Sequence, residues 1–537
     1  MSEEEWSWDL PEETQAALPP PRPRRVPPSR GKRALQSGDD FRRAMVLTVA
    51  GTVLPGLGLI AAKRRVVGTV VLGLFGLTLL SLGVWALVDL KSLLSIAVRP
   101  TVLHTLTVLL VLAAVVWVGV VIGSHLALRP ARPTAAQRVT GSVLVGFLAF
   151  AVAAPMAVAA RYSYDQAGLV STVFQSGKKS KSATRPTFAP PSNRKEDPWK
   201  GKPRVNVLLL GGDSGPDRTG TRTDTVILAS IDTSTGDTTL FSLPRNTARM
   251  PFPADSPLHR YYPHGFTDGN GENAEFFLNA IYQNVPANVP PDVLGSTDNL
   301  GADALKLSVG TALGLKVDYY MLINLKGFKQ MINALGGIRL NVNTYIPIGG
   351  SIDHGVLPSG YLKPGKNQLL DGEHALWYAR SRWGSDDYAR MDRQRCVINA
   401  MIQQANPANV LARYEAIAKA GKDIIRTDIP QEMLPMMVEL SLRVKDGNVR
   451  SIVFRHGSQG FFSNRPDFAL MRQRVKAAIG EAKKAPTPKP SSAPTQSASG
   501  RSAKPRKSAT TPASEDVTDS CAWRPEIAAT AQPPQTR

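Results

Sequence analysis

Four long segments without a single Lys, Arg, Asp or Glu constrain this chain more than any other feature. They cover residues 44–62, 66–88, 101–128 and 139–160. Each is close to the ~20 apolar residues that a helix needs to cross the hydrocarbon core of a bilayer. Buried core helices are the alternative, which these lengths disfavour. The pattern therefore predicts a multi-span α-helical membrane region over residues 44–160.

The basic residues around these segments predict their orientation. The connections "KRR" (63–65) and "RPARPTAAQR" (129–138) are basic, so the positive-inside rule places both in the cytoplasm. Residues 1–43 are Pro-rich, begin acidic and end basic, which indicates a disordered cytoplasmic tail rather than a cleavable signal. Four full spans cannot leave both this tail and the "KRR" loop inside. We therefore expect the first run, interrupted by "LPGLG", to be re-entrant or interfacial, and residues from 161 onward to be extracellular.

The remainder of the chain divides by composition. Residues 161–203 are rich in Lys, Ser and Pro and predict a linker, whereas residues 485–537 are mostly low-complexity and predict a disordered Pro/Ser-rich tail. Residues 204–484 have the pattern of a globular domain. Strands are expected at 204–211, 224–232, 238–244, 319–325, 338–342 and 451–454. Helices are expected at about 273–284, 301–313, 326–335, 385–405, 407–421, 430–443 and 466–482. Such mixing predicts a layered α/β domain with a mixed central sheet flanked by helices.

Charge and cysteine content add two limits. The formal net charge of +21 suits an anionic surface, but no nucleic-acid recognition motif accompanies it, so nucleic acid is not an expected partner. Cys396 and Cys521 are the only cysteines. Because an extracellular compartment permits oxidation, we predict that they form a disulfide that holds "DSCAWRP" against the domain. Two unpaired thiols are the alternative.

The stretch "GGDSGPDRTGTRTDT" (211–225) follows an apolar strand and supports two interpretations. Its Gly-Asp-Ser, with Ser214 as nucleophile and the Asp-x-x-His of "DGEH" (371–374), matches a serine hydrolase, although both motifs are short and common. Alternatively, Asp213 and Asp224 flank a loop between two strands, and paired hard carboxylates suit Mg²⁺ or Mn²⁺. No Walker lysine accompanies them.

An arginine cluster favours the second interpretation. "LWYARSRWGSDDYARMDRQRCVI" (376–398) contains five arginines and no lysine, namely Arg380, Arg382, Arg390, Arg393 and Arg395. The planar guanidinium grips phosphate oxygens bidentately and stays charged when partly buried. A salt-bridged surface helix is the alternative explanation.

The helix expected after this cluster's first two arginines places further residues. Ser385 is a candidate N-cap, which puts Asp387 in the first turn, where the helix dipole favours a carboxylate. Asp387, Arg390 and Gln394 then share one helix face.

Three motifs in order resemble the LytR-CpsA-Psr family: "VNVLLLGGDSG…RTDTVILASID…SLPRNT", "GLKVDYYMLINLKGFKQMINALGGI" and "LLDGEHALWYARSRWGSDDYARMDRQR". The resemblance covers about 204–400. It implies an extracellular catalytic domain that transfers polyprenyl-pyrophosphate-linked glycopolymer, of teichoic acid, arabinogalactan or capsule type, to peptidoglycan through a phosphodiester link. Such an enzyme is a phosphotransferase, or glycopolymer–peptidoglycan ligase, and pyrophosphatase activity is compatible with the same site.

The resemblance also implies site residues. Asp213 and Asp224 would bind the metal, Mg²⁺ or Mn²⁺. The remaining matches, assigned to the pyrophosphate or to the later motif, are Arg222, Arg245, Arg380, Arg382, Asp387, Arg390, Arg393 and Gln394. Arg218 lies in the variable part of the first loop and is a weaker candidate. Asn246 stands where the family usually has Asp, and an amide neither accepts a proton nor binds a cation strongly.

The sequence leaves a second class of function open. A non-catalytic lipid-pyrophosphate-binding or regulatory membrane protein would use the same arginines without turnover. The family usually has one membrane span before this domain, so the additional apolar segments are an elaboration. The expected localisation is the cell membrane, multi-pass, with the domain outside and the bilayer, lipid-linked glycopolymer and peptidoglycan as partners.

Overall fold

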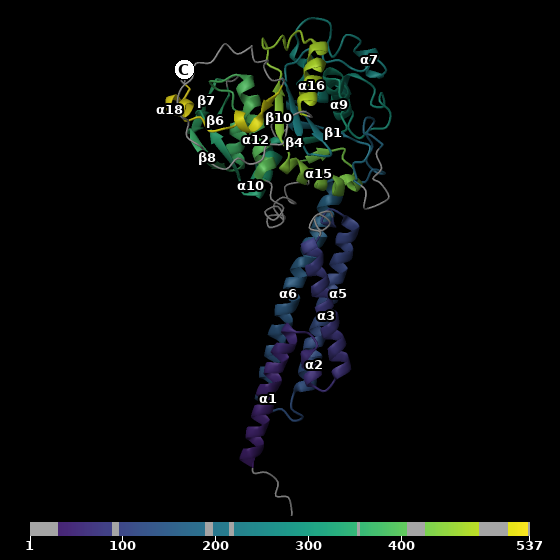
Figure 1. Ribbon diagram of the computed structural model, residues 1–537, viewed down its shortest axis with the longest axis vertical. Helices are drawn as coiled ribbons and strands as arrows, with labels where there is room; N and C mark the ends of the chain where they lie inside the picture. The colour runs from purple at the N-terminus through teal and green to yellow at the C-terminus, as the bar shows by residue number, and fades with distance from the viewer. Residues whose placement is uncertain are drawn as a thin grey trace, which may run out of the picture. The chain divides into compact units, whose positions relative to one another are not determined.

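The computed structural model describes residues 30–88, 96–187, 197–213, 220–351, 355–404, 425–482 and 514–534 (Figure 1). The chain divides into two compact units, residues 1–80 with 113–155 and residues 81–112 with 156–537. The predicted helix at 407–421 and the tail residues 1–29 and 485–513 lie outside the described residues.

The apolar segments form helices. Their bounds are α1 (Arg30–Val53), α2 (Leu57–Ala61), α3 (Arg65–Val88), α5 (Pro100–Leu128) and α6 (Ala135–Val173). Three helical stretches in the described residues are long and apolar enough to cross a membrane: Arg65–Trp85, Pro100–Leu128 and Ala135–Val173. Many of their large apolar side chains are exposed, for example Leu77, Leu109 and Phe150. Since water disfavours such surfaces, the helices indicate membrane anchoring.

One boundary of the membrane region differs from the prediction, and the expected interruption of the first apolar run is present. Helix α1 begins at Arg30, so a disordered tail reaching residue 43 is wrong from that residue on. The first apolar run is divided: α1 ends at Val53, and the short α2 follows Gly56, which has a φ of 100°. Pro55 lacks the N–H that a continuing helix needs, which explains the break.

The second unit is built on a mixed central sheet, as the sequence predicts, and this sheet has seven strands. Its order is β11-β10-β3-β2-β1-β4-β9. The strands are β1 (Arg204–Gly212), β2 (Thr223–Asp232), β3 (Thr238–Leu243), β4 (Tyr319–Asn324), β9 (Ile425–Thr427), β10 (Val449–Val453) and β11 (Glu515–Asp516). The pairs β1/β4 and β3/β10 are parallel, and the others are antiparallel.

Helices cover both faces of this sheet, so side chains that point to either face of a strand are buried. One face packs on α8 (Ile281–Asn288), α9 (Leu300–Leu313) and α16 (Phe468–Ala482); the other packs on α12 (Asp387–Gln404), α15 (Leu434–Asp446) and α17 (Val517–Ser520). Leu208 and Leu228 lie in the first core, whereas Val207 and Ile227 lie in the other two. Helix α9 is thus a core helix.

Smaller elements complete the unit. They are α7 (Leu258–Tyr261), η1 (Ala274–Phe276), η2 (Leu278–Ala280), α10 (Leu325–Leu335), β5 (Ile338–Val342), β6 (Ile346–Ser351), β7 (Val356–Leu362), β8 (Gly365–Leu370), α11 (Gly372–Arg380), η3 (Gln431–Met433) and α18 (Pro525–Thr530). The strands among them form two separate two-stranded sheets, β5 with β8 and β6 with β7.

The predicted linker is partly a docked segment. Helix α6 continues to Val173, beyond the predicted span. Farther along, Ser182 Oγ donates to Asp303 Oδ1 at 2.8 Å and the backbone N–H of Ala183 donates to Asp303 Oδ2 at 2.9 Å. A simple tether over 161–203 is therefore wrong here, because the serine-rich segment supplies donors to a carboxylate that is 1% exposed.

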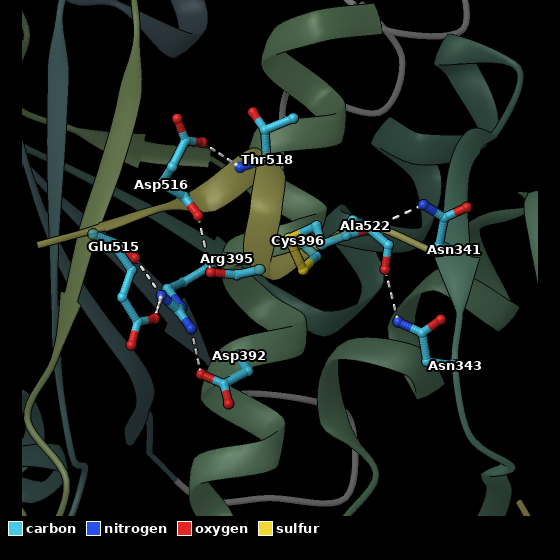
Figure 2. The surroundings of a disulfide bond; sticks show 12 residues. Asn341, Asn343, Asp392, Arg395, Cys396, Glu515, Asp516, Thr518 and Ala522 are labelled. Atoms are coloured by element: carbon cyan, nitrogen blue, oxygen red, sulfur yellow. Dashed lines mark hydrogen bonds and ion pairs between the residues drawn. A yellow bond between two sulfur atoms is a disulfide. The ribbon is translucent and has the colours of Figure 1, made fainter. Parts of the chain in front are cut away.

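A C-terminal clamp holds the end of the described chain on the domain. We use this name for Asp392, Arg395, Arg455, Glu515 and the disulfide Cys396–Cys521. Figure 2 labels Asp392, Arg395, Cys396 and Glu515 of this set. The predicted disulfide is confirmed, with a Cα–Cα distance of 5.6 Å across a sequence separation of 125. Arg395, which is 2% exposed, pairs with Asp392 and with Glu515. The side chains of Asn341 and Asn343 donate to the carbonyl oxygens of Cys521 and Ala522, both at 3.0 Å.

The clamp corrects the prediction of a disordered tail for residues 515–530. Here β11 extends the sheet beside β10, and Val517 is fully buried. Low-complexity composition predicts disorder only where no apolar or covalent anchor interrupts it.

Candidate active site

The topology brings three strand ends to one edge of the sheet. Because β2 runs antiparallel to both β1 and β3, the end of β1, the start of β2 and the end of β3 coincide. Asp213 follows β1, Asp224 is the second residue of β2, and Arg245 lies just after β3. A register shift at Gly211/Gly212 marks the point where β1 leaves the pairing.

Helices α11 and α12 supply the other side chains. Arg380 ends α11, Arg382 lies in the connection, and Arg390 lies in the first turns of α12. With the strand-end residues they enclose a pocket of about 210 Å³, which we call the arginine pocket. It is lined by Asp213, Arg222, Asp224, Arg245, Asn279, Arg380, Arg382 and Arg390. Five arginines thus face two aspartates, which leaves an excess of positive charge suited to an anion.

Asp224 and Arg245 form the centre of this arrangement. Arg245 Nη1 donates to Asp224 Oδ1 at 2.9 Å, and Asn279 Nδ2 donates to the same oxygen at 3.2 Å. Burial raises the pKa of Asp224, but the charges of Arg245 and Arg390 and these hydrogen bonds outweigh it, so that the pKa lies below its ordinary value. Asp224 is therefore ionised at neutral pH.

Arg390 is the most buried of the pocket arginines, at 4% exposure. Burial lowers its pKa to about 10, which leaves the guanidinium charged at neutral pH. Its Nη2 donates to Asp387 Oδ2 at 3.1 Å and to the carbonyl oxygen of Asp224 at 3.2 Å. Asp387 also lies 3.7 Å from Arg245 Nε. Asp387 therefore orients two pocket arginines from outside the pocket lining.

Asp213 and Arg222 close the loop between β1 and β2. Asp213 Oδ1 accepts from the backbone N–H of Arg222 at 2.8 Å, and the backbone N–H of Asp213 donates to the carbonyl oxygen of Arg222 at 3.0 Å. The Arg222 guanidinium pairs with Glu275. The backbone thus holds Asp213 in place while Arg222 reaches the pocket wall.

Arg393 and Gln394 do not line the arginine pocket. Arg393 Nε donates to the carbonyl oxygen of Tyr378 at 2.6 Å, and its Nη2 donates to that of Ser381. Gln394 Nε2 donates to the carbonyl oxygen of Ala379 at 3.2 Å. These carbonyls lie at the C-terminal end of α11, where intrahelical partners run out. Both side chains therefore fix the segment that carries Arg380 and Arg382, rather than facing the pocket.

The remaining predicted residues lie outside the described residues or outside the arginine pocket, or concern the start of α12. Ser214 and Arg218 lie outside the described residues. The expected Asp-x-x-His contact exists, since Asp371 Oδ1 lies 2.7 Å from His374 Nδ1, but Asp371 caps α11 and neither residue lines the arginine pocket. Ser385 is not the cap: the Asp386 carboxylate accepts from the backbone N–H of Ala389 at 2.7 Å. Asp387 lies in the first turn of α12, as predicted.

Asn279 is the pocket residue that sequence reasoning missed. It lies in η2, within a segment whose apolar pattern predicts only a helix, and nothing in its neighbourhood resembles a site motif.

The donor set is compatible with a hard divalent cation. Asp213 and Asp224 both line the pocket, and no group of three His, Cys, Asp or Glu side chains with metal-binding geometry occurs among the described residues. Mg²⁺ commonly takes only one or two protein carboxylates and completes its shell with water and substrate phosphates. The two aspartates fit that role, and Mg²⁺ stays a prediction.

These features define a membrane-anchored α/β protein whose pocket is built for an anion. The LytR_cpsA_psr family model matches residues 167–459, more than half of the 537 residues, and the chain belongs to the LytR_cpsA_psr family.

Three relatives illustrate the family. A protein of Enterococcus faecalis, named polyisoprenyl-teichoic acid–peptidoglycan teichoic acid transferase TagU, is 30% identical over 234 residues, which are 42% of this chain and 62% of that protein. The protein of the same name from Oceanobacillus iheyensis is 29% identical over 271 residues, 47% of this chain and 70% of that protein. Biofilm regulatory protein A of Streptococcus mutans is 27% identical over 230 residues, 42% of this chain and 50% of that protein. The first match thus spans less than two thirds of the relative's length.

Proposed function

We propose that this protein transfers a glycopolymer from a polyprenyl pyrophosphate carrier to peptidoglycan. The observation that carries the proposal is the arginine pocket, in which five arginines surround two aspartates. A pyrophosphate supplies the negative charge that this pocket lacks, and guanidinium groups match its oxygens bidentately. Two of the relatives are named as transferases of lipid-linked teichoic acid, which supports the same chemistry here.

The reaction is a displacement at phosphorus. The oxygen of an acceptor hydroxyl forms a bond to the phosphorus that carries the glycopolymer, and the bond from that phosphorus to the bridging pyrophosphate oxygen breaks. The hydroxyl proton is released, and polyprenyl phosphate leaves. Arg245, Arg382 and Arg390 stabilise the charge that develops on the transferred and departing phosphates. A divalent cation on Asp213 and Asp224 would add charge neutralisation.

Turnover distinguishes this proposal from its competitors. The full-length protein in detergent is incubated with a polyprenyl pyrophosphate and Mg²⁺, with and without a chelator, and polyprenyl phosphate is measured. We expect metal-dependent release that Ser214→Ala leaves largely intact and Asp224→Ala abolishes. Binding without release would instead support a regulatory role, for which the name of the Streptococcus mutans relative offers a precedent. Metal-independent activity lost with Ser214→Ala would indicate a serine hydrolase.

We further propose that the α/β domain is extracellular. The basic "KRR" and "RPARPTAAQR" connections support this topology through the positive-inside rule, and peptidoglycan as acceptor requires it. Protease added to intact cells should remove the domain. Digestion only after lysis would contradict the topology, whatever the activity.

A further inference from the structure

A second pocket opens at the same sheet edge and has no role in the chemistry above. Its volume is about 350 Å³. Four separate segments line it, through Asn246, Glu272, Phe277, Tyr388, His456, Ser463 and Asn464. We call it the neutral pocket.

The neutral pocket borders the arginine pocket along two stretches of chain. Arg245 lines one pocket and the next residue, Asn246, lines the other. Asp387 contacts Arg245 and Arg390 of the arginine pocket, and the next residue, Tyr388, lines the neutral one. Because β10 runs parallel to β3, the chain after β10 also emerges at this edge and brings His456 there. A ligand in the neutral pocket therefore lies next to an anion in the arginine pocket.

The two pockets differ in charge. Among the residues that the structure describes, no arginine or lysine lines the neutral pocket, and Glu272 is its one carboxylate. A pyrophosphate would gain nothing from this lining. Aromatic rings from Phe277 and Tyr388 combine with amide and hydroxyl groups, which suits an uncharged ligand with both apolar faces and hydroxyl groups, such as a sugar ring.

Hydrogen bonds fix the polar side of this pocket. The backbone N–H of His456 donates to the Tyr388 hydroxyl at 2.8 Å, and the backbone N–H of Ser463 donates to His456 Nδ1 at 3.2 Å. A backbone N–H that donates to Nδ1 favours the tautomer with the proton on Nε2, in which His456 can donate a hydrogen bond to a ligand hydroxyl. Asn246 Nδ2 lies 3.5 Å from Ser463 Oγ. Asn246, where the family pattern has Asp, keeps this wall uncharged.

We infer that the neutral pocket binds a sugar ring of the acceptor glycan and presents its hydroxyl to the phosphorus in the arginine pocket. This inference rests on the proposed function. His456 and Asn246 hydrogen-bond the sugar, and Phe277 and Tyr388 pack against its faces. They position the nucleophile and take no part in the bond changes.

Acceptor binding tests the inference separately from turnover. The full-length protein in detergent is titrated with a soluble peptidoglycan oligosaccharide, and KM values for donor and acceptor are measured in parallel. We compare His456→Ala, Asn246→Ala and their combination with His264→Ala, an exposed histidine outside both pockets. Each single change should weaken oligosaccharide binding and raise the acceptor KM roughly three- to tenfold, and the combination more, whereas the donor KM should change less than about twofold.

Three outcomes would overturn the inference. An unchanged dissociation constant in the combined variant would show that the sugar binds elsewhere. A rise in the donor KM equal to that in the acceptor KM would assign the neutral pocket to the donor. An equal effect of His264→Ala would show that the change is not local. If the wild-type protein binds the oligosaccharide but releases no polyprenyl phosphate, the proposed transfer is wrong and the sugar site is still supported. Thermal unfolding of each variant identifies those that are misfolded.

Discussion

Helix α12 carries arginines into two regions that use them differently. In the arginine pocket, Arg390 belongs to a set of five arginines facing two aspartates. Less than two turns later, Arg395 belongs to the C-terminal clamp, where Arg395 and Arg455 face Asp392 and Glu515. Both Arg390 and Arg395 are almost completely buried, at 4% and 2% exposure. Counting Asp387 and Glu275, which pair with pocket arginines, the pocket has five arginines against four carboxylates, whereas the clamp has two of each. Charge balance, and not burial or residue type, therefore separates the two regions.

An arginine-rich stretch can therefore serve binding or the fold, according to the carboxylates around it. In a set with equal numbers of arginines and carboxylates, each buried arginine has an acidic partner, so removing one member leaves an uncompensated charge and destabilises the fold. A set with more arginines than carboxylates keeps a net positive charge, which attracts an anion. We therefore expect substitutions of the pocket arginines to change mainly the rate, and substitutions in the clamp to change mainly the stability.

The largest effect is expected in the arginine pocket. Arg382→Ala removes a cation that meets the charge developing on phosphate, so kcat for polyprenyl phosphate release should fall by roughly two to three decades, or about 3–4 kcal/mol. The thermal midpoint should hardly move. Arg260→Ala, which alters an exposed arginine of α7, is the matched control. If Arg382→Ala lowered the thermal midpoint so far that unfolding explained the loss of kcat, the two regions would not differ in the role of their arginines.

A smaller effect, on stability alone, is expected in the clamp. Replacing both Cys396 and Cys521 by Ser opens a loop with a sequence separation of 125, which should lower the free energy of unfolding by about 2–4 kcal/mol. Well below the melting temperature, kcat should stay within about threefold of the wild-type value. Thermal unfolding and turnover are measured on the same samples. An unchanged midpoint would mean that Asn341, Asn343 and the buried Val517 hold the segment without the disulfide.

The smallest effect is expected in the pH dependence of stability, through the ionised Asp224. The folded-state pKa of Asp224 lies below its ordinary value, so its ionised form stabilises the fold at pH above the unfolded-state value of about 4, and this contribution is lost as pH falls through the folded-state pKa. Asp224→Asn should therefore be less stable than wild type at pH 7, with the gap closing toward pH 3. Thermal midpoints at pH 7, 5 and 3 measure it. If the difference in thermal midpoint between wild type and Asp224→Asn grew as the pH fell, the predicted direction of the pKa effect would be wrong.

Local patterns predicted much of this molecule. Uncharged runs indicated the apolar helices, and alternating apolar stretches indicated β1, β2 and β3, because each signal lies within a few neighbouring residues. The prediction missed α11, where nine residues containing Glu373, His374 and Arg380 lack a long apolar stripe. Its start was nevertheless marked, since Asp371 caps the helix by accepting from the backbone N–H of His374 at 2.9 Å.

Pairing between strands that are distant in sequence determines which residues line each pocket, and local sequence patterns do not predict that pairing. Asp213, Asp224 and the arginines were predicted because charged residues stand out within apolar flanks, and the structure gathers most of them in one pocket. The neutral pocket had no such signal. Asn246 and His456 are unremarkable in sequence, and only the parallel register that pairs Ser242 with Val453 brings their segments together.

That register also has a consequence for the speed of folding. The parallel pairs join Val207 to Tyr319 and Thr238 to Val449, so the sheet is complete only after two very long stretches of chain have closed. The conformational entropy of such closures must be lost before the contacts form, which makes folding slow. Until then, the β1–β2–β3 meander has two unpaired outer edges, which are templates for association with other chains. The newly made domain is therefore most prone to aggregation during the interval in which its pockets do not yet exist.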